Sequence, residues 1–259
     1  IIDNGYSTEG EKVRPKWEDG SYAYTIKKFG VVNRYDLSRE FPIMTLRRTA
    51  FKSCIDEILW IWQKKSNNIK DLNSHIWDEW ADENGSIGKA YGYQLGVRHQ
   101  YKEGMMDQVD RVLYDLKNNP YSRRIMTNIY VHQDLHEMNL YPCAYSMTFN
   151  VTGNKLNAIL NQRSNDILTA NNWNVVQYAV LVHMIAQVSG LEAGDLVHVI
   201  ADARNEKQLI SDCECRIRCG QHNRRGSNYS DNNRHHLKYR RVYRCCLYRV
   251  IRPFERQFF

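Results

Sequence analysis

The chain has 259 residues and a net charge of +7, and 42% of its residues are hydrophobic and 12% aromatic. A chain of this size and composition buries a core in one or at most two domains, which excludes a disordered linker, a collagen-like fibre and a disulfide-stapled miniprotein. No apolar run is long enough to cross a bilayer, and the first residues carry no cleavable signal, so we expect a cytoplasmic protein without a membrane partner.

The first half of the chain carries two amphipathic helices. In residues 52–63 and again in residues 108–116, apolar side chains recur every three or four positions, the spacing of a helix with one buried face. Glu57 lies close to the apolar stripe of the first helix. A carboxylate at such a position needs a reason, either a chemical role or a buried ion pair or cap.

A hairpin, a long helix and a further strand follow. Apolar and polar residues alternate over 145–151, and a Gly-Asn turn leads into a second strand over 155–161, so a hairpin is predicted. Residues 173–188 are apolar over more than half of the helix circumference, which predicts a central buried helix, and a strand over 196–200 follows it. Residues 1–203 are therefore expected to form one mixed α/β domain.

A cysteine just before the hairpin is the first candidate for chemistry. Cys143 follows Pro142, which restricts the path of the chain into the strand. By itself such a cysteine is most often an inert core residue. The second hairpin strand ends in Gln162-Arg163-Ser164-Asn165-Asp166, so an arginine, a hydroxyl and a carboxylate would converge near the thiol. A guanidinium group there would stabilise a thiolate, and with the serine it suits a phosphate oxygen.

An arginine pair follows the second amphipathic helix. Asn118-Asn119-Pro120 ends that helix, and Arg123 and Arg124 come directly after Ser122. Adjacent arginines on a surface are most often solvated, but two guanidinium groups on a tight turn also clamp a phosphate dianion. Both interpretations stay open on these residues alone.

The motifs occur together in the order and spacing of one enzyme family. The chain resembles thymidylate synthase from about residue 13 to residue 203, on the segments Pro142-Cys143, Gln162 to Asp166, Asn174, Ser122-Arg123-Arg124 and His75-Ile76-Trp77-Asp78-Glu79-Trp80. The resemblance implies an α/β (α+β) fold in which helices flank a mixed sheet, and a homodimer formed through that sheet. It also implies the reductive methylation of dUMP to dTMP, with 5,10-methylenetetrahydrofolate as donor of both carbon and hydride and with no metal.

The resemblance assigns a role to each candidate side chain. Cys143 is the expected nucleophile, since a soft thiolate adds to carbon 6 of a uracil ring. Catalysis would be assisted by Glu57, Tyr91, Asn174 and Arg163. The substrate dUMP would be bound by Arg14, Gln162, Arg163, Ser164, Asn165, Asp166 and Asn174, with Arg123 and Arg124 donated across the dimer interface. The reduced folate would contact Trp77, Trp80 and Asp166.

The choice of asparagine carries an argument about the substrate. The side-chain amide of Asn174 offers both the donor and the acceptor that the N3 and O4 edge of uracil needs, whereas a cytosine-type substrate would favour a carboxylate. We therefore expect dUMP as substrate in preference to dCMP. For Trp77 and Trp80 the alternative is a plain core role.

The last 56 residues differ from the rest of the chain. Residues 1–203 hold 22 Lys and Arg against 24 Asp and Glu, so the whole positive excess lies in residues 204–259, together with five of the seven cysteines. The family pattern stops at Asp202-Ala203, where a His-x-Tyr motif is expected and Arg204-Asn205-Glu206 stands instead. Our hypothesis is a frameshifted or otherwise disrupted reading frame.

Other interpretations of the tail and of the function stay open. The cysteines and histidines of the tail are numerous enough for a zinc site, although their spacing matches no standard finger. Its arginines and tyrosines suit RNA or DNA, but we expect no nucleic-acid partner for the domain because the charge excess is confined to the tail. The alternatives for the function are an impaired subunit that binds nucleotide or RNA, and a hydroxymethylase acting on dUMP.

Overall fold

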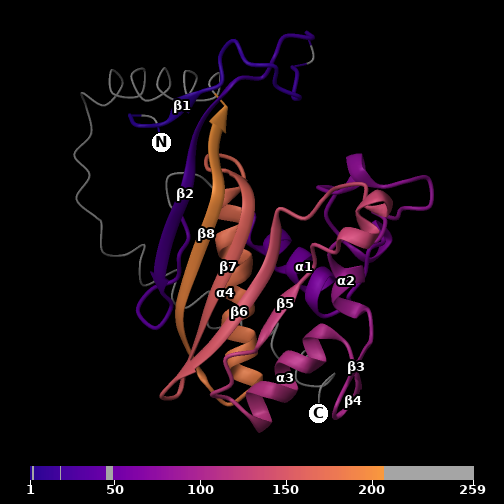
Figure 1. Cartoon of the computed structure of the whole chain (residues 1–259), viewed down its shortest axis with the longest axis vertical. Helices are drawn as coiled ribbons and strands as arrows, with labels where there is room; N and C mark the ends of the chain where they lie inside the picture. Colours follow the sequence, from indigo (N-terminus) through magenta and orange to yellow (C-terminus); the bar gives the residue numbers. More distant parts are fainter. Residues whose placement is uncertain (2, 18, 45–48, 207–259) are drawn as a thin grey trace.

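The computed structural model of the protein describes residues 1, 3–17, 19–44 and 49–206 (Figure 1). From residue 207 onward the predicted tail lies outside the described residues, so its frameshift, zinc and nucleic-acid hypotheses stay predictions, as does the domain boundary at residue 203. Within the described part of the chain, no helix is both long and apolar enough to span a bilayer.

A six-stranded mixed sheet lies at the centre of the described molecule, in the order β1-β2-β8-β7-β6-β5. Neighbouring strands are antiparallel, except that β7 and β8 run parallel. Its strands are β1 (Tyr6–Ser7), β2 (Thr25–Asp36), β5 (Met126–Asn128), β6 (Ala144–Thr152), β7 (Lys155–Asp166) and β8 (Glu192–Glu206). A separate two-stranded sheet consists of β3 (His99–Tyr101) and β4 (Gly104–Met106).

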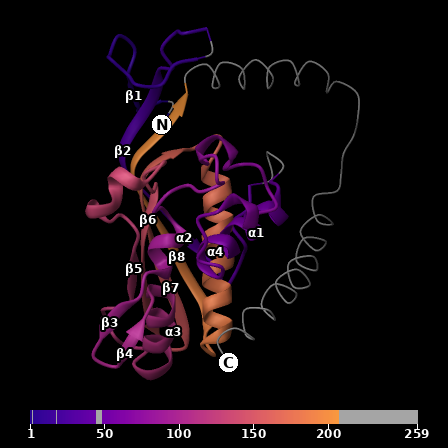
Figure 2. The ribbon, with the colours of Figure 1, turned by 90° about the vertical axis from the view of Figure 1, so that its right-hand side faces the viewer.

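The main helices lie on one face of the large sheet (Figure 2). The crossover helix α4 (Asn171–Val188) connects the parallel strands β7 and β8 and packs on both of them, and α1 (Phe51–Trp62) packs on α4. The other helices are α2 (Gly92–Gly96), α3 (Gln108–Asn118) and the short 3₁₀ helices Ile69–Asp71, Asp78–Trp80 and His132–Glu137. Since α4 is covered on one side by strands and on the other by α1, apolar residues all round it are buried.

Alternation along the hairpin separates a buried face of the sheet from an uncovered one. Met147, Phe149 and Leu160 point toward α4 and are at most 1% exposed, whereas Thr148 and Ile159 pair on the opposite face. Figure 1 looks onto that opposite face, which no described helix covers over β2, β8 and β7. The core therefore lies between the sheet and the helices, and none of the residues that the structure describes forms a layer on the other face of the sheet.

The expected fold of helices and a mixed sheet is confirmed, with differences at the edges of elements. The predicted helices agree with α1, α3 and α4 within two residues. The strands β7 and β8 are longer than predicted, because each is paired on both sides by a neighbour that the local sequence does not reveal. The strand β2, between β1 and β8, is a further difference, because the sequence pattern does not predict it.

Candidate active site

Cys143 is the residue that leads directly into β6. Its backbone N–H donates to the phenolic oxygen of Tyr91 at 3.2 Å, and its carbonyl accepts a hydrogen bond from the backbone N–H of Arg163 at 2.9 Å. The pairing of β6 with β7 is irregular between Ala144 and Ser146, directly after the cysteine. The thiol is half-buried and free, so the cysteine is fixed by its backbone and accessible at its side chain.

The other cysteine of the described chain has a different environment. Cys54 lies on α1 and has no exposed surface. Burial raises the pKa of its thiol to about 12, and the nearby Glu57 acts in the same direction. A thiol with this pKa holds its proton at neutral pH and is a poor nucleophile. Cys143 is thus the better placed of the two for covalent chemistry.

Arg163 holds the segment that precedes Cys143. Its Nε donates to the carbonyl of Pro142 at 2.9 Å, and one terminal nitrogen donates to the carbonyl of Tyr141 at 2.8 Å. These bonds use part of the guanidinium group and leave further N–H donors of the same group. The arginine therefore orders the approach to the cysteine and keeps the capacity to bind an anion.

Glu57 lies in the core beside two tryptophans. The indole N–H of Trp77 donates to Oε1 at 3.0 Å and that of Trp173 donates to Oε2 at 2.6 Å. Burial raises the pKa of the Glu57 carboxyl to about 7, and the two indole hydrogen bonds reduce the shift. The carboxyl is thus poised to gain or lose a proton near neutral pH, which suits a general acid or base.

Tyr91 connects the glutamate to the cysteine. It precedes α2 with a φ of +47°, a conformation that non-glycine residues rarely adopt. Its ring contacts Trp77 edge to face at a centroid distance of 4.9 Å, while its oxygen accepts the hydrogen bond from Cys143. Burial, with the neighbouring Cys143, raises the pKa of Tyr91 well above its ordinary value, so the phenol keeps its proton.

Asn174 projects from the first turns of α4 into a group of amides. Its Oδ1 accepts from Gln162 Nε2 at 3.0 Å and from Asn165 Nδ2 at 3.4 Å, and its Nδ2 donates to Gln177 Oε1 at 3.3 Å. Gln162 pairs across the hairpin with Ala144, the residue after the cysteine. The asparagine amide is therefore held in a fixed direction close to the Cys143 segment.

The side chains predicted for the folate differ in exposure. Trp77 is 6% exposed and packs against Trp60, Trp80 and Tyr91, whereas Trp80 is only partly buried. Asp166 ends β7, is half-buried, and accepts a hydrogen bond from the backbone N–H of Thr169. Trp80 and Asp166 are thus the two of these residues that combine a fixed position with an accessible surface.

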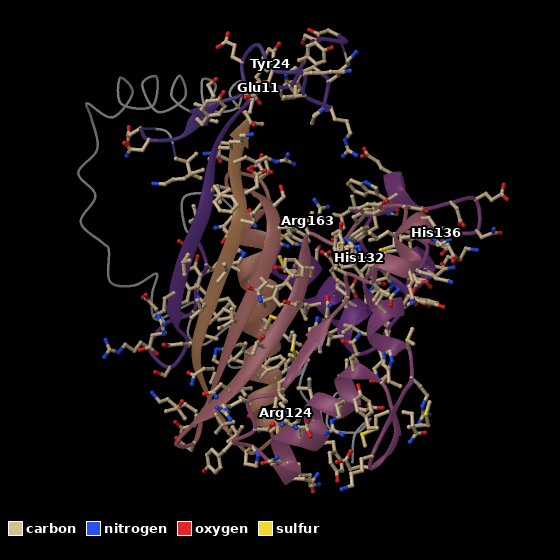
Figure 3. The ribbon with its side chains drawn as sticks, in the orientation of Figure 1. Glu11, Tyr24, Arg124, His132, His136 and Arg163 are labelled. Atoms are coloured by element: carbon tan, nitrogen blue, oxygen red, sulfur yellow. The ribbon has the colours of Figure 1, made fainter. Side chains whose placement is uncertain are left out.

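Some predicted residues do not join this group within the single chain. Arg123 and Arg124 are exposed after α3, and Figure 3 shows Arg124 toward the lower end of the sheet, away from Arg163. Arg14 is exposed in the segment between β1 and β2, and no hydrogen bond among the described residues joins it to the Cys143 segment. Ser164 is half-buried on β7. Within the described ranges, no cluster of His, Cys, Asp or Glu is suited to a metal ion.

Three residues of the site are absent from the sequence-based prediction. Trp173 bonds Glu57 directly, Gln177 contacts Asn174, and His198 on β8 lies 2.8 Å from Gln162. The signal for Gln177 is its spacing, because it lies one helical turn after Asn174 on an otherwise apolar helix. Trp173 and His198 look like ordinary core residues until their partners are known.

Known proteins share this sequence and fold. The profile of the thymidylate synthase family matches residues 1–217. A thymidylate synthase of Bacillus subtilis subsp. natto is 47% identical over 207 residues, covering 78% of this chain and 74% of that protein, and one of Bacillus phage phi3T is 46% identical with the same coverage. The solved structure of the thermostable thymidylate synthase A from Bacillus subtilis has a TM-score of 0.79 at 42% identity, covering 84% of this chain and 80% of that one. The chain therefore belongs to the thymidylate synthase family, whose members are methyltransferases.

Proposed function

We propose that the chain catalyses the reductive methylation of dUMP to dTMP, with 5,10-methylenetetrahydrofolate as co-substrate. The observation that carries the proposal is the fixed position of Cys143 between Tyr91 and Arg163, with the proton-carrying Glu57 linked to it through Trp77. A held nucleophile, an arginine and a buried acid are the three groups that addition to a uracil ring requires.

In this reaction the Cys143 thiolate adds to carbon 6 of the uracil ring, and the electron pair of the C5–C6 double bond moves toward O4. Asn174 donates from Nδ2 to O4 and accepts at Oδ1 from N3–H, so it holds the ring and stabilises the developing charge. Glu57, with a pKa of about 7, supplies and recovers a proton on the O4 side. Arg163 and Ser164 bind the phosphate, together with Arg14.

The residues on the other side of the site fit a reduced folate. Trp80 presents part of an indole face, which stacks well on a flat heterocycle, and the carboxylate of Asp166 accepts hydrogen bonds from ring N–H groups. When bound, the folate supplies a one-carbon unit and a hydride. Trp80 and the buried Trp77 behind it shield the site from water on this side.

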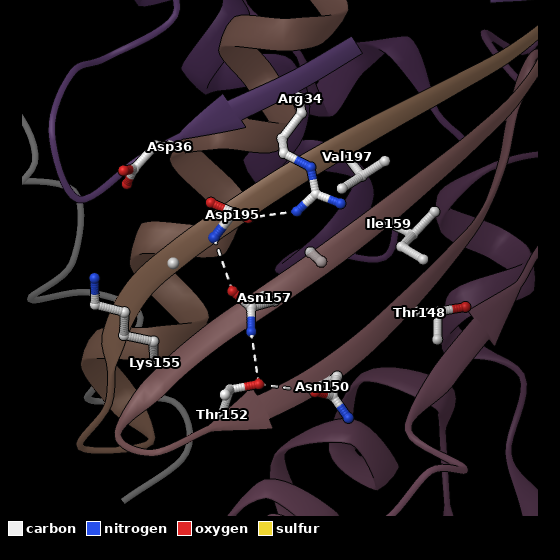
Figure 4. Close-up of a pocket in the computed structure, with 12 residues that line it drawn as sticks. Arg34, Asp36, Thr148, Asn150, Thr152, Lys155, Asn157, Ile159, Asp195 and Val197 are labelled. Atoms are coloured by element: carbon white, nitrogen blue, oxygen red, sulfur yellow. Dashed lines mark hydrogen bonds and ion pairs between the residues drawn. The ribbon is translucent and has the colours of Figure 1, made fainter. Parts of the chain in front are cut away.

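We further propose that two copies pair through the uncovered face of the sheet. Val32 on β2 is 60% exposed and Ile159 on β7 is 40% exposed, both on this face, and Figure 4 shows the hollow around Ile159 and Val197. Polar groups joined by hydrogen bonds lie beside them, and among these the backbone N–H of Asp195 donates to Oδ1 of Asn157. Pairing would bring Arg123 and Arg124 of each subunit to the phosphate in the other.

The test is mass spectrometry after incubation with 5-fluoro-dUMP and the folate. Fluorine at carbon 5 does not leave as a proton does, so the expected product is a covalent complex of Cys143 with nucleotide and folate. The Cys143→Ser variant should give no adduct, and Cys54→Ser should give the same adduct as the parent chain. Binding of the nucleotide without any adduct would favour the impaired subunit. A second incubation, with dUMP in place of the fluorinated nucleotide, should give dTMP, and a product one oxygen atom heavier than dTMP would identify a hydroxymethylase.

A further inference from the structure

A chain of buried polar side chains leads from β8 to the proposed uracil-reading amide. His198 on β8 has no exposed surface, and its Nε2 lies 2.8 Å from Oε1 of Gln162 on β7. Gln162 is 3% exposed, and its Nε2 donates to Oδ1 of Asn174 on α4 at 3.0 Å. His198 thus lies behind the site, one side chain removed from Asn174, with no place for it in the reaction described above.

The pairing of the strands explains why these side chains meet. Leu160 pairs with His198 and Gln162 pairs with Ile200 across the parallel strands β7 and β8, so His198 and Gln162 point to the same face. That face is the one on which α4 packs, and Asn174 lies in the first turns of α4. The strands β7 and β8 and the helix α4 therefore bring the imidazole of His198 and the amides of Gln162 and Asn174 into hydrogen-bonding contact within the core.

The direction of each hydrogen bond in this chain follows from the histidine. An amide oxygen accepts and does not donate, so the contact with Gln162 Oε1 requires a hydrogen on His198 Nε2. With its oxygen turned to His198, Gln162 presents its NH₂ group to Asn174, and Asn174 must then present its oxygen to Gln162. The Nδ2 of Asn174 then faces away from Gln162. It donates one of its hydrogens to Oε1 of Gln177, and the second hydrogen is available to a ligand.

Two further observations indicate that this histidine has a directing role. Burial lowers the pKa of His198 to about 4, so the ring is neutral at physiological pH and carries a single hydrogen, the one on Nε2. Its Nδ1 is buried without a hydrogen-bond partner in the part of the chain that the structure describes. An unpaired buried nitrogen costs stability, so an apolar side chain of similar shape would serve packing better.

We propose that His198 is a positioning residue which, through Gln162, fixes the direction of the Asn174 amide and thereby the preference of the site for uracil over cytosine. Uracil presents an acceptor at carbon 4 and a donor at N3, and cytosine presents the reverse, so an amide turned by half a rotation would read cytosine instead. The other partners of Asn174, Asn165 and Gln177, are amides that can themselves turn over, so the imidazole alone gives the group a fixed direction. Without a donor at residue 198, Gln162 is free to turn over, and Asn174 turns with it. The inference rests on the proposed function, because it needs Asn174 to face the pyrimidine.

The test compares the binding of dUMP and dCMP to the full chain by calorimetry, which requires no turnover. His198→Phe keeps a flat ring and removes the donor, and we expect the ratio of dUMP to dCMP affinity to fall about tenfold, the worth of one directed hydrogen bond. His198→Gln restores an N–H donor and should recover most of the ratio. The matched control is His183→Phe, since His183 is a half-buried histidine on α4 that stacks on Phe41 and has no contact with Gln162 among those the structure describes.

The outcomes separate this inference from the proposed function. If the parent chain binds no dUMP, the proposed function fails. If the parent chain binds dUMP and His198→Phe weakens both nucleotides equally, His198 has only a structural role and the inference is overturned. Nitrogen-15 NMR of the parent chain tests the same idea without any variant, because we expect a neutral ring with hydrogen on Nε2, and hydrogen on Nδ1 would also overturn it.

Discussion

Glu57 is a carboxyl group that folding removes almost completely from water. Its pKa rises from 4.5 to about 7 because burial disfavours the charged form. Between these two values the folded chain keeps a proton that the unfolded chain releases. The free energy of unfolding therefore falls as the pH rises through this window, by up to about 1.4 kcal/mol for each pH unit, and the loss is complete above pH 7.

Replacing Glu57 with Gln removes this titration, so we expect the stability of Glu57→Gln relative to the parent chain to increase by about 2 to 3 kcal/mol between pH 5 and pH 8. Urea unfolding at the two pH values measures the difference. Glu83→Gln, at an exposed position, is the control and should follow the parent at both. An equal offset at pH 5 and pH 8 would show that Glu57 does not titrate in this range.

Glu57 also shows how much of the site can be predicted from the sequence alone. The position of Glu57 beside an apolar stripe already indicates an unusual carboxylate. The donors that hold it are 20 and 116 residues away, at Trp77 and Trp173, and nothing in the local pattern connects them. His198 gives no signal for a similar reason, because a histidine in an apolar strand looks like a core residue until its neighbour Gln162 is placed.

Short elements position the site as much as long ones do, and α2 is the clearest case. It begins directly after Tyr91, and its two glycines differ in their surroundings. A Cβ on Gly92 would lie 2.3 Å from the backbone oxygen of Ser66, whereas a Cβ on Gly96 would meet only the side-chain Cβ of Lys65 at 3.1 Å and nothing else closer than 3.7 Å. The Ser66 backbone cannot move aside as the Lys65 side chain can, so only Gly92 is required by its surroundings.

We expect Gly92→Ala to destabilise the chain by about 1–3 kcal/mol, the usual cost of overpacking, and Gly96→Ala to change stability by less than about 1 kcal/mol because better helix propensity offsets its tight contact. Urea unfolding measures both. Movement of Tyr91 away from Cys143 should also lower kcat in Gly92→Ala at a temperature where both variants are folded. Equal effects of the two substitutions would contradict the close approach of α2 to Ser66.

The sequence predicts a helix or strand well where a hydrophobic pattern repeats over many residues. It fails where pairing with a strand distant in the sequence determines the element. The helix α4 is recognisable from 18 residues of mainly apolar sequence, and the hairpin from its alternation and its Gly-Asn turn. The strand β2 contains two lysines and Gly30 at a φ of +71°, which interrupt its pattern, so its pairing with β8 defines it. The five residues of α2 are too few to carry a periodic signal.

At the scale of the whole molecule, the uncovered sheet face and the distant arginines point to the same conclusion. A sheet with helices on one side leaves its other side to be covered by something else. The sequence resemblance predicts a dimer through the sheet, but which residues face outward becomes known only once the strands are paired. Ile159 pairs with Thr148 on one side and Val197 on the other, which places it well inside this face.

A charge at the centre of this face should separate the proposed dimer. Ile159→Asp would bring two unpaired carboxylates into the interface, one from each copy, and we expect the dimer dissociation constant to rise by at least about 100-fold. Sedimentation velocity measures the change. Met105→Asp is the matched control, because Met105 is 46% exposed but lies on β4, outside the large sheet.

Activity should follow the same equilibrium, because Arg123 and Arg124 would act on the phosphate in the other subunit. The Ile159→Asp variant should therefore lose kcat/KM for dUMP at low protein concentration and regain it as the concentration rises, while Met105→Asp stays constant. Unchanged sedimentation of Ile159→Asp would exclude this face as the interface. A monomeric variant with full activity would instead show that each subunit binds the phosphate with its own residues, Arg163 and Ser164 first among them.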